Sequence, residues 1–374
     1  MAVIRRIEAF AHSSPVEPAR VAGSGPTRTL AHVVVRVADS DGAIGYGECP
    51  AIPAAMAMIE AVGRELLGVD PLAREYQMNR FRWWFHSAFA VSALSIALDD
   101  LAARRLGVSI AALYGGPFRA HVQAYGASYG SLPGRTLESW IDEAEALAAR
   151  GFLAMKVRLG VLPVAEECNA LEQLRARMPP SLALMGDGNG GFNATTARQM
   201  GRCAEELGLL WFEEPLPIED YVGYPELAAA LTIPLAGGEL SQTRPATLEL
   251  LSKGPVDIIQ PDPVNCGGIG EVIFTGALAR LFGRLCVPHT SGGAIGVAAG
   301  LQALACLPDQ SLLGLNELQF LEYPALVDPI QRAIAPNLLE PKDGWVDVPT
   351  SPGLGIDIDG DAVERLASSR LMVE

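Results

Sequence analysis

Three segments of the chain run from apolar residues into an acid: SLALMGDGN (181–189), LLWFEEP (209–215) and IPLAGGE (233–239). The acids are Asp187, Glu213 and Glu239, and they follow one another at equal intervals. Each interval leaves room for one helix between two short buried strands, which is the repeat unit of a parallel α/β fold.

The same rhythm extends in both directions from these segments. We expect strands at 121–127, 153–158, 182–187, 209–213, 234–238, 256–261, 285–288 and 318–322. We expect helices at 136–150, 163–177, 194–208, 224–231, 243–253, 268–283 and 295–307. Eight strands with intervening helices predict a parallel β/α barrel.

The residues before the barrel have a different pattern. The β-branched run Val33–Val37, the turn Asp39–Gly42 and the run Ala43–Glu48 predict a hairpin, and helices are expected at 54–67 and 87–114. The division that follows is an α+β domain over 1–120, a barrel over 121–340, and a segment over 341–374, rich in Pro, Gly and Asp, that returns to the first domain.

Composition excludes several classes of protein. The 374 residues carry a formal net charge of −15, which disfavours binding to nucleic acid or to an anionic membrane. The six cysteines form no C-x-x-C pair, so we expect neither a disulfide framework nor a zinc knuckle, and a cytoplasmic location. Met1–Phe10 lacks the pattern of a signal peptide, and the glycine-rich stretch Gly292–Leu307 indicates a buried helix.

Acids at consecutive strand ends predict a metal site. Functional residues of a β/α barrel lie at the C-terminal ends of its strands, and adjacent strands are roughly 4.8 Å apart. The carboxylates of Asp187, Glu213 and Glu239 can therefore converge on one hard cation, such as Mg²⁺, Mn²⁺ or Ca²⁺. Any one of them alone would be read as a helix cap or a solvated charge; the series of three favours the metal.

Candidate bases lie at other strand ends. His289 is the one histidine of five at the C-terminal end of a predicted barrel strand, and Asp262 ends the adjacent strand. A carboxylate beside an imidazole fixes its tautomer and supports its cationic form, although a hydrogen-bonded core histidine is the alternative for His289 alone. Glu322, at the end of the last strand, is either a site residue or a cap or surface charge.

The basic residues Lys156 and Arg158 alternate along one strand, so they point to the same side. Only three of the 28 basic residues are lysine, which makes a lysine within an apolar strand notable. Both cations are expected to face the acids, where they would neutralise metal ligands and a substrate carboxylate.

These motifs together resemble the enolase superfamily, and within it the mandelate racemase group. The resemblance covers nearly the whole chain and rests on motifs in order: Gly45-Tyr46-Gly47-Glu48, the segment 92–116, Asp187-Gly188-Asn189, Glu213-Glu214-Pro215, Gly238-Glu239, Gln260-Pro261-Asp262, Pro288-His289-Thr290 and Leu321-Glu322-Tyr323. It implies an α+β capping domain, completed by the C-terminal segment, over a modified TIM barrel of the (β/α)₇β type.

The resemblance also implies a reaction. Enzymes of this superfamily remove the proton α to a carboxylate with a Lys or His base, and Mg²⁺ stabilises the enolate. In this sequence His289, paired with Asp262, would be the base, and Glu322 would donate a hydrogen bond to a carboxylate oxygen. Asn189 is expected to contact the substrate. Asp187, Glu213 and Glu239 would bind one Mg²⁺, with Mn²⁺ as an alternative.

One departure from the group's pattern concerns Arg158. The group's fullest pattern has a second lysine at this position, which serves relatives as a base on the opposite face of the substrate. Arginine does not accept a proton at neutral pH, so a two-base racemase is disfavoured. The predicted function is a sugar-acid dehydratase. The alternatives are a racemase, epimerase or lactone cycloisomerase, and a barrel that binds acid sugars without catalysis.

The identity of the sugar acid is not predicted. The resemblance assigns specificity to capping-domain loops at about 12–29 and 49–57. Arg20 and Arg28 in the first of these would suit a second substrate carboxylate, but a solvated surface position is favoured for them. Relatives are often oligomers, so a homo-oligomer is expected.

Overall fold

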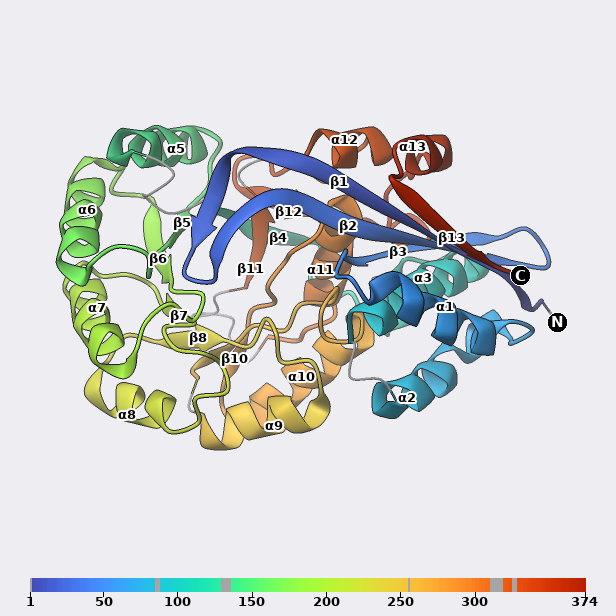
Figure 1. Ribbon diagram of the computed structural model, residues 1–374, viewed down its shortest axis with the longest axis horizontal. Coiled ribbons are helices and arrows are strands. Elements are labelled where there is room, and N and C mark those ends of the chain that lie inside the picture. The colour runs from blue at the N-terminus through green and yellow to red at the C-terminus, as the bar shows by residue number, and fades with distance from the viewer. Residues whose placement is uncertain (1, 85–87, 129–135, 255, 310–318, 325–327) are drawn as a thin grey trace.

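The computed structural model describes the chain except for residues 1, 85–87, 129–135, 255, 310–318 and 325–327. It contains an antiparallel sheet at one end and a barrel at the other, as Figure 1 shows. No helix in the described part of the chain is both long and apolar enough to cross a lipid bilayer.

The first domain is built on a four-stranded antiparallel sheet in the order β13-β1-β2-β3. Its strands are β1 (Ile4–Ala22), β2 (Gly25–Asp39), β3 (Ile44–Pro50) and β13 (Ser369–Val373). Its helical segments are α1 (Ala55–Leu66), η1 (Pro71–Ala73), α2 (Arg74–Trp84), α3 (Ala88–Leu106) and α4 (Ile110–Leu113). Because β13 comes from the end of the chain and pairs with β1, the C-terminal segment completes the capping domain.

In the part of the chain that the structure describes, the barrel consists of eight parallel strands. They are β4 (His121–Ala127), β5 (Ala154–Arg158), β6 (Ala183–Asp187), β7 (Phe212–Glu213), β8 (Leu235–Gly237), β9 (Ile258–Ile259), β10 (Leu285–Cys286) and β11 (Phe320–Pro324). Strands β4 to β10 lie side by side in chain order, and β11 returns to pair with β4.

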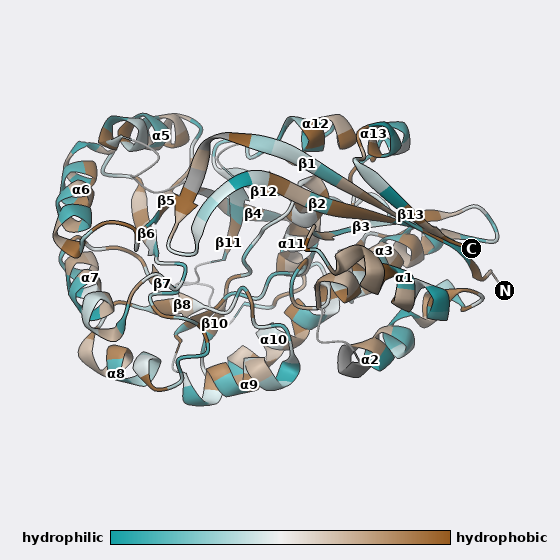
Figure 2. Cartoon of the chain, in the orientation of Figure 1, coloured by the Kyte–Doolittle hydropathy of each residue, from teal (hydrophilic) through white to brown (hydrophobic). Residues whose placement is uncertain are grey.

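A helix follows each of the first seven barrel strands, so the fold is the predicted (β/α)₇β barrel. These helices are α5 (Leu137–Ala149), α6 (Val164–Arg177), α7 (Ala194–Glu206), α8 (Gly223–Ala230), α9 (Arg244–Lys253), α10 (Ile269–Leu281) and α11 (Ala294–Ala305). Hydrophilic and hydrophobic residues mix along α5 to α9 in Figure 2, as expected for helices with one face on the core and one in water.

The C-terminal segment contacts both domains. After α12 (Pro329–Ile334), the strand β12 (Trp345–Asp347) pairs antiparallel with β4 of the barrel. The helix α13 (Gly360–Arg365) then leads into β13 of the capping sheet. The domain boundaries at residues 120 and 340 stay a prediction.

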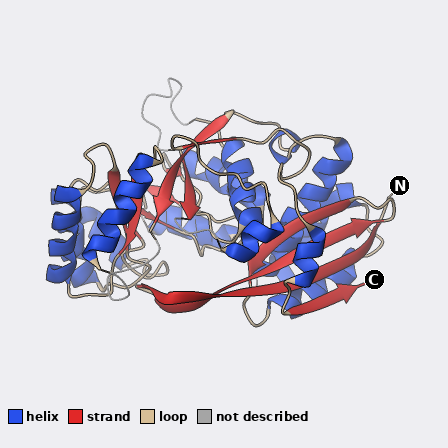
Figure 3. Ribbon diagram, turned by 90° about the horizontal axis from the view of Figure 1, so that it is seen from above, coloured by secondary structure: helices blue, strands red, loops and turns tan. Residues whose placement is uncertain are grey.

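Two details of the capping domain differ from expectation. The helix expected over 87–114 is two helices, α3 and α4, because Gly107 has φ of 70° and ends the first. Much of the segment 12–29, expected as a loop, is the far half of the β1–β2 hairpin. Figures 1 and 3 show this hairpin extending from the sheet to the barrel mouth.

The tip of the hairpin packs tightly on the barrel. A Cβ atom on Gly23 would overlap the carbonyl oxygen of Gly188 and would lie 2.9 Å from Gly191 Cα. Both barrel glycines belong to the loop that follows Asp187 at the end of β6. The hairpin therefore covers the mouth of the barrel next to the predicted metal ligands.

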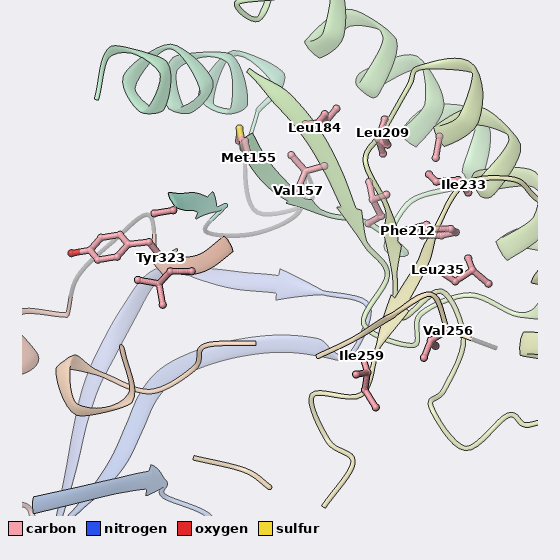
Figure 4. Packing of buried hydrophobic residues seen from close by; sticks show 14 of the residues in the cluster. Met155, Val157, Leu184, Leu209, Phe212, Ile233, Leu235, Val256, Ile259 and Tyr323 are labelled. Atoms are coloured by element: carbon pink, nitrogen blue, oxygen red, sulfur yellow. The ribbon is translucent and has the colours of Figure 1, made fainter. Parts of the chain in front are cut away.

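Alternation along the barrel strands separates two layers. Met155, Val157, Leu184, Phe212 and Leu235 point outward into the main apolar cluster between strands and helices, as Figure 4 shows. A smaller cluster fills the inside and contains Tyr125, Ala154, Met185, Trp211, Ala236, Ile258, Val287 and Phe320. Because side chains alternate, the polar residues in register with the inner cluster also point inward.

A glycine on β3 is required by the close approach of α3. A Cβ atom on Gly47 would overlap the carbonyl oxygen of Ala93, so Gly47→Ala is expected to destabilise the protein by about 1–3 kcal/mol. The matched variant is Gly63→Ala in α1, where a Cβ atom would lie at an ordinary 3.5 Å from Ile7 Cδ1. Alanine there should gain up to about 1 kcal/mol from helix propensity. Thermal unfolding of both variants checks this, and equal stability would contradict the tight packing.

Candidate active site

The inner layer of the barrel ends in charged residues. Lys156 and Arg158 share the inward register of Ala154, and Asp187 shares that of Met185. Glu213, Asp262, His289 and Glu322 likewise stand two or four residues beyond inward apolar residues of their strands. Strand alternation therefore brings most of the predicted site to the C-terminal mouth of the barrel.

Glu239 is brought there by a different device. It lies one residue out of the inward register, but Gly238 has φ of 110°, a conformation that favours glycine. The chain turns at that point, so the side chain of Glu239 faces a cavity at the mouth of the barrel. Its Oε2 lies 3.0 Å from Nε2 of His289.

Asp187 and Glu213 are direct neighbours, because they pair in register at the ends of β6 and β7, and both are buried. Lys156 lies between them with its Nζ 2.6 Å from Glu213 Oε1 and 3.5 Å from Asp187 Oδ2. A third carboxylate, Glu322, is 2.9 Å from the same Nζ. Burial alone would lower the pKa of Lys156, but the three carboxylates outweigh it and raise the pKa, so this lysine stays charged.

Lys156 is fully buried and does not line the cavity at the barrel mouth. Its ammonium lies 5.6 Å from the ring centre of Tyr125, beneath the charged layer. It therefore acts as a counter-ion to the acids, and its predicted role toward a substrate carboxylate stays a prediction.

Both oxygens of Glu213 have partners. Oε1 accepts from Lys156, and Oε2 accepts from Trp211 Nε1 at 3.1 Å and from Gln260 Nε2 at 2.8 Å. Burial and the neighbouring acids nevertheless outweigh the pull of Lys156 and raise the pKa of Glu213 to about 7. Added positive charge would stabilise the ionised form of a carboxylate in such a crowded acidic site.

Glu214 adds a further buried acid next to Glu213. It has φ of 35°, and its Oε1 accepts from the backbone of Gly238 at 3.3 Å. Burial and then the charges of Glu239, Asp187 and Glu213 raise its pKa well above the usual range. The sequence motif contained this residue, but its burial among the other acids emerges only in the structure.

The chemical type of the donor atoms, all carboxylate oxygens, suits a hard divalent cation. Asp187, Glu213 and Glu239 offer oxygen ligands from three adjacent strands, and the buried Oε2 atom of Glu239 is paired with the imidazole of His289. Among the described residues no three acidic, His or Cys side chains already converge as a coordination sphere. Lys156 and His289 instead lie against these carboxylates.

Arg158 stands at the edge of the acids and borders the cavity. Its guanidinium pairs with Asp187 and donates to Asn189 Oδ1 at 3.0 Å. Burial would lower its pKa, but Asp187 and then Glu322 and Glu239 outweigh burial and raise it, so Arg158 is a permanent cation. Asn189, which also donates its backbone N–H to Asp187 at 2.9 Å, lines the cavity beside it.

His289 and Asp262 form the predicted pair. Nδ1 of His289 is 2.7 Å from Asp262 Oδ2, which also accepts from the backbone and hydroxyl of Ser291 at 2.9 and 2.6 Å. The other oxygen of Asp262 accepts from the backbone N–H of Val264 at 2.9 Å. These bonds hold Asp262 in place so that it orients the ring, leaving Nε2 of His289 toward Glu239 and the cavity.

The charge on His289 is set by its neighbours. Burial by itself would lower the pKa of this imidazole, but Glu239, Glu322 and the hydrogen bond with Asp262 outweigh burial and raise the pKa well above its usual value. In this arrangement the ring therefore holds its proton at neutral pH, and positive charge that offsets Glu239 and Glu322 would free Nε2 to accept one.

Glu322 lies between Lys156 and His289. It accepts from the hydroxyl of Tyr125 at 2.8 Å, and its Oε2 is 3.7 Å from His289 Nε2. Lys156, His289 and Arg158 outweigh its burial and lower its pKa to about 2. An ionised Glu322 accepts hydrogen bonds, whereas the donor role that the resemblance implies requires its protonated form.

A cavity of about 450 Å³ opens above this charged layer. Ligand sites typically measure about 300–1,000 Å³, so it can take a small acid. Its floor includes Arg158, Asn189, Glu239, His289 and Glu322. Its opposite wall comes from the capping domain and from residues after β11.

Several partners of the site were not identified from the sequence. Trp211 and Gln260 bind Glu213, Tyr125 binds Glu322, and Ser291 binds Asp262. A usable signal existed for Trp211, which precedes Glu213 by two residues and therefore shares its face. The others depend on which strands become neighbours.

Both halves of the chain match known families. Residues 5–115 match the family described as mandelate racemase / muconate lactonizing enzyme, N-terminal domain, and residues 139–362 match the enolase C-terminal domain-like family. The chain is 36% identical over 347 residues to D-galactarolactone cycloisomerase of Agrobacterium fabrum, covering 89% of this chain and 90% of that protein.

Further relatives include enzymes of another type. Arabinonate dehydratase of Saccharolobus solfataricus is 29% identical over 350 residues, which cover 89% of this chain and 90% of that protein. The crystal structure of L-talarate/galactarate dehydratase from Salmonella typhimurium LT2 with Mg and L-lyxarohydroxamate superposes with a TM-score of 0.87 at 26% identity, covering 100% of this chain and 94% of that chain.

Proposed function

Because the chain belongs to the mandelate racemase group of the enolase superfamily, we propose that it removes the proton α to the carboxylate of a sugar acid and breaks the neighbouring C–O bond. The observation that carries this proposal is the His289–Asp262 pair, held 2.7 Å apart at the floor of the cavity. An oriented imidazole at this place is a general base.

The steps balance with this chain's own residues. His289 Nε2 takes the proton from C2 of a 2,3-dihydroxy acid, and the electron pair of that bond forms the C2–C3 double bond. The C3–O bond breaks with its electron pair on oxygen, and His289 returns the proton so that water leaves. The resulting enol tautomerises to a 2-keto-3-deoxy acid, which makes the enzyme a hydro-lyase.

The acids would hold the metal. We assign Asp187, Glu213 and Glu239 as ligands of one Mg²⁺, with Mn²⁺ as an alternative, because they are the oxygen donors at three adjacent strand ends. When bound there, a divalent cation would stabilise the negative charge that develops on the substrate carboxylate. Arg158 supplies further fixed positive charge at the cavity edge, and Asn189 is positioned beside it.

A single base limits the reaction. A one-to-one racemase or epimerase needs a second proton acceptor on the opposite face of the substrate, and the permanent cation Arg158 stands at the position where the group's second lysine would be. An elimination needs only one base, since His289 can serve in both proton steps.

A lactone cycloisomerase is the second candidate. It is favoured by the 36% identity to D-galactarolactone cycloisomerase. The proton abstraction is the same, but the oxygen that leaves is a lactone ring oxygen. It leaves as a carboxylate, so no proton has to be delivered to it.

The test is a panel of sugar acids and their lactones with purified protein and Mg²⁺, with 2-keto acid as the readout. We expect at least one acid or lactone to yield a 2-keto-3-deoxy acid, and EDTA to stop the reaction. NMR in D₂O identifies the leaving group and should show no epimer of the recovered substrate. An epimer as the product would overturn the elimination, and binding without turnover of any compound would favour a barrel that only binds acid sugars.

A further inference from the structure

The wall of the cavity that faces the catalytic residues is built from the capping hairpin and the segment after β11. Leu30 and His32 of β2 line it, together with Asp328 and Gln331. The two parts are tied together, because Ser14 of β1 donates its hydroxyl to Asp328 Oδ1 at 2.7 Å. This wall therefore lies opposite the floor that would hold the reacting end of a substrate.

A helix N-terminus at this wall is already filled. Helix N-termini bind anions through free N–H groups, and α11 begins beside the cavity at Gly293 and Ala294. Glu48 of β3 accepts from the N–H of Gly293 at 2.6 Å and of Gly296 at 3.0 Å, and Gln331 Oε1 accepts from Ala294 at 3.1 Å. The protein's own carboxylate therefore occupies the place that a substrate carboxylate would need.

On this wall the described residues that can carry charge are Asp328 and His32. Asp328 borders the cavity as a carboxylate. His32 also borders it, and its Nδ1 lies 3.2 Å from the fully buried Glu48. Of the described lining residues, the others that can carry positive charge are Arg158 and His289, both on the floor.

The same wall offers neutral hydrogen-bonding groups. Gln331 is buried, and the bond from Ala294 to its Oε1 fixes the amide so that Nε2 is the free donor. That Nε2 has no hydrogen-bond partner among the residues that the structure describes. A hydrogen bond to a ligand oxygen, such as a hydroxyl or a lactone carbonyl, would remove the free-energy cost of a buried donor without a partner.

We propose that the substrate bears one negative charge, at the end held by the floor, and that its far end against Asp328 and Gln331 is uncharged. The substrate class is then an aldonate or the lactone of an aldarate, and not an aldarate dianion. This inference rests on the proposed function and narrows it. Arg28 does not oppose it, because this residue is exposed and does not line the cavity.

The experiment compares a hexonate, the hexarate of the same configuration and the hexarate's 1,4-lactone in the presence of Mg²⁺. Calorimetry gives Kd and the 2-keto acid assay gives kcat/KM for each compound. We expect the hexonate or the lactone to be favoured over the hexarate by about 100-fold, because like charges in contact oppose binding.

Asp328→Asn tests the cause of this preference, since it removes the charge but keeps the acceptor for Ser14 and for the first turn of α12. The preference should fall by about tenfold or more. The matched control is Asp359→Asn, which caps the equally short helix α13 and lies outside the cavity lining. It should leave the preference unchanged.

The outcomes separate the two proposals. A hexarate that binds and reacts as well as the single-charge compounds overturns this inference and leaves the elimination intact. A preference in Kd without any 2-keto acid overturns the proposed function and leaves the inference intact. An Asp328→Asn variant with an undiminished preference removes Asp328 as its cause and overturns the inference as argued.

Discussion

Replacing His289 by asparagine is expected to lower kcat by about 10³-fold or more, because the variant has no group that can take the α proton. Asparagine can still bond to Asp262, so the loop after β10 should keep its shape. The readout is 2-keto acid formation, together with exchange of the C2 proton in D₂O. Both should be lost.

Two controls make the His289 result specific. His121→Asn changes an exposed histidine at the start of β4, where the ring packs against Trp345, and should leave kcat unchanged. Mg²⁺ binding by the His289→Asn variant, measured by calorimetry, should persist. Retained turnover in this variant would remove His289 as the base.

Replacing Lys156 by methionine is expected to lower the free energy of unfolding by about 3–5 kcal/mol, measured in EDTA. The ammonium is fully buried and is shared by Glu213, Glu322 and Asp187. Removing it leaves three carboxylates in a small buried space with less compensation. Denaturant unfolding gives the magnitude.

The control for Lys156 is another of the few lysines. Lys253 is exposed on α9 and pairs with Glu249 at 2.5 Å, one turn earlier. Lys253→Met should leave the unfolding midpoint within experimental error, since exposed ion pairs contribute little. Equal stability of the two methionine variants would show that Lys156 is not the counter-ion of the acidic layer.

Much of the fold and site could be predicted because the position of a residue along a strand determines whether its side chain points into or out of the barrel. The alternation of side chains turns Lys156, Asp187, Glu213 and Glu322 inward as soon as their segments are strands of a barrel. The order of the strands then follows the order of the chain, which is why acids at equal intervals become neighbours. Side-chain alternation and strand order are local and repetitive features, and such features can be predicted from a sequence.

Other features depend on contacts between distant segments. Glu239 reaches the cavity only through the turn at Gly238, and the far half of the β1–β2 hairpin lies where the sequence predicts a loop. Tyr125 meets Glu322 because the first and last barrel strands pair. None of these contacts has a fixed spacing in the sequence.

The sequence by itself determined the barrel, the acidic strand ends and the His289–Asp262 pair, because each follows from strand periodicity and chain order. Only the tertiary structure decided that Lys156 lies beneath the cavity while Arg158 borders it. It also decided that Glu48 of the capping sheet closes the N-terminus of α11, nearly 250 residues later in the chain. The physical reason is burial: whether a charge meets substrate or another protein group depends on how the two domains pack, and no local pattern specifies that packing.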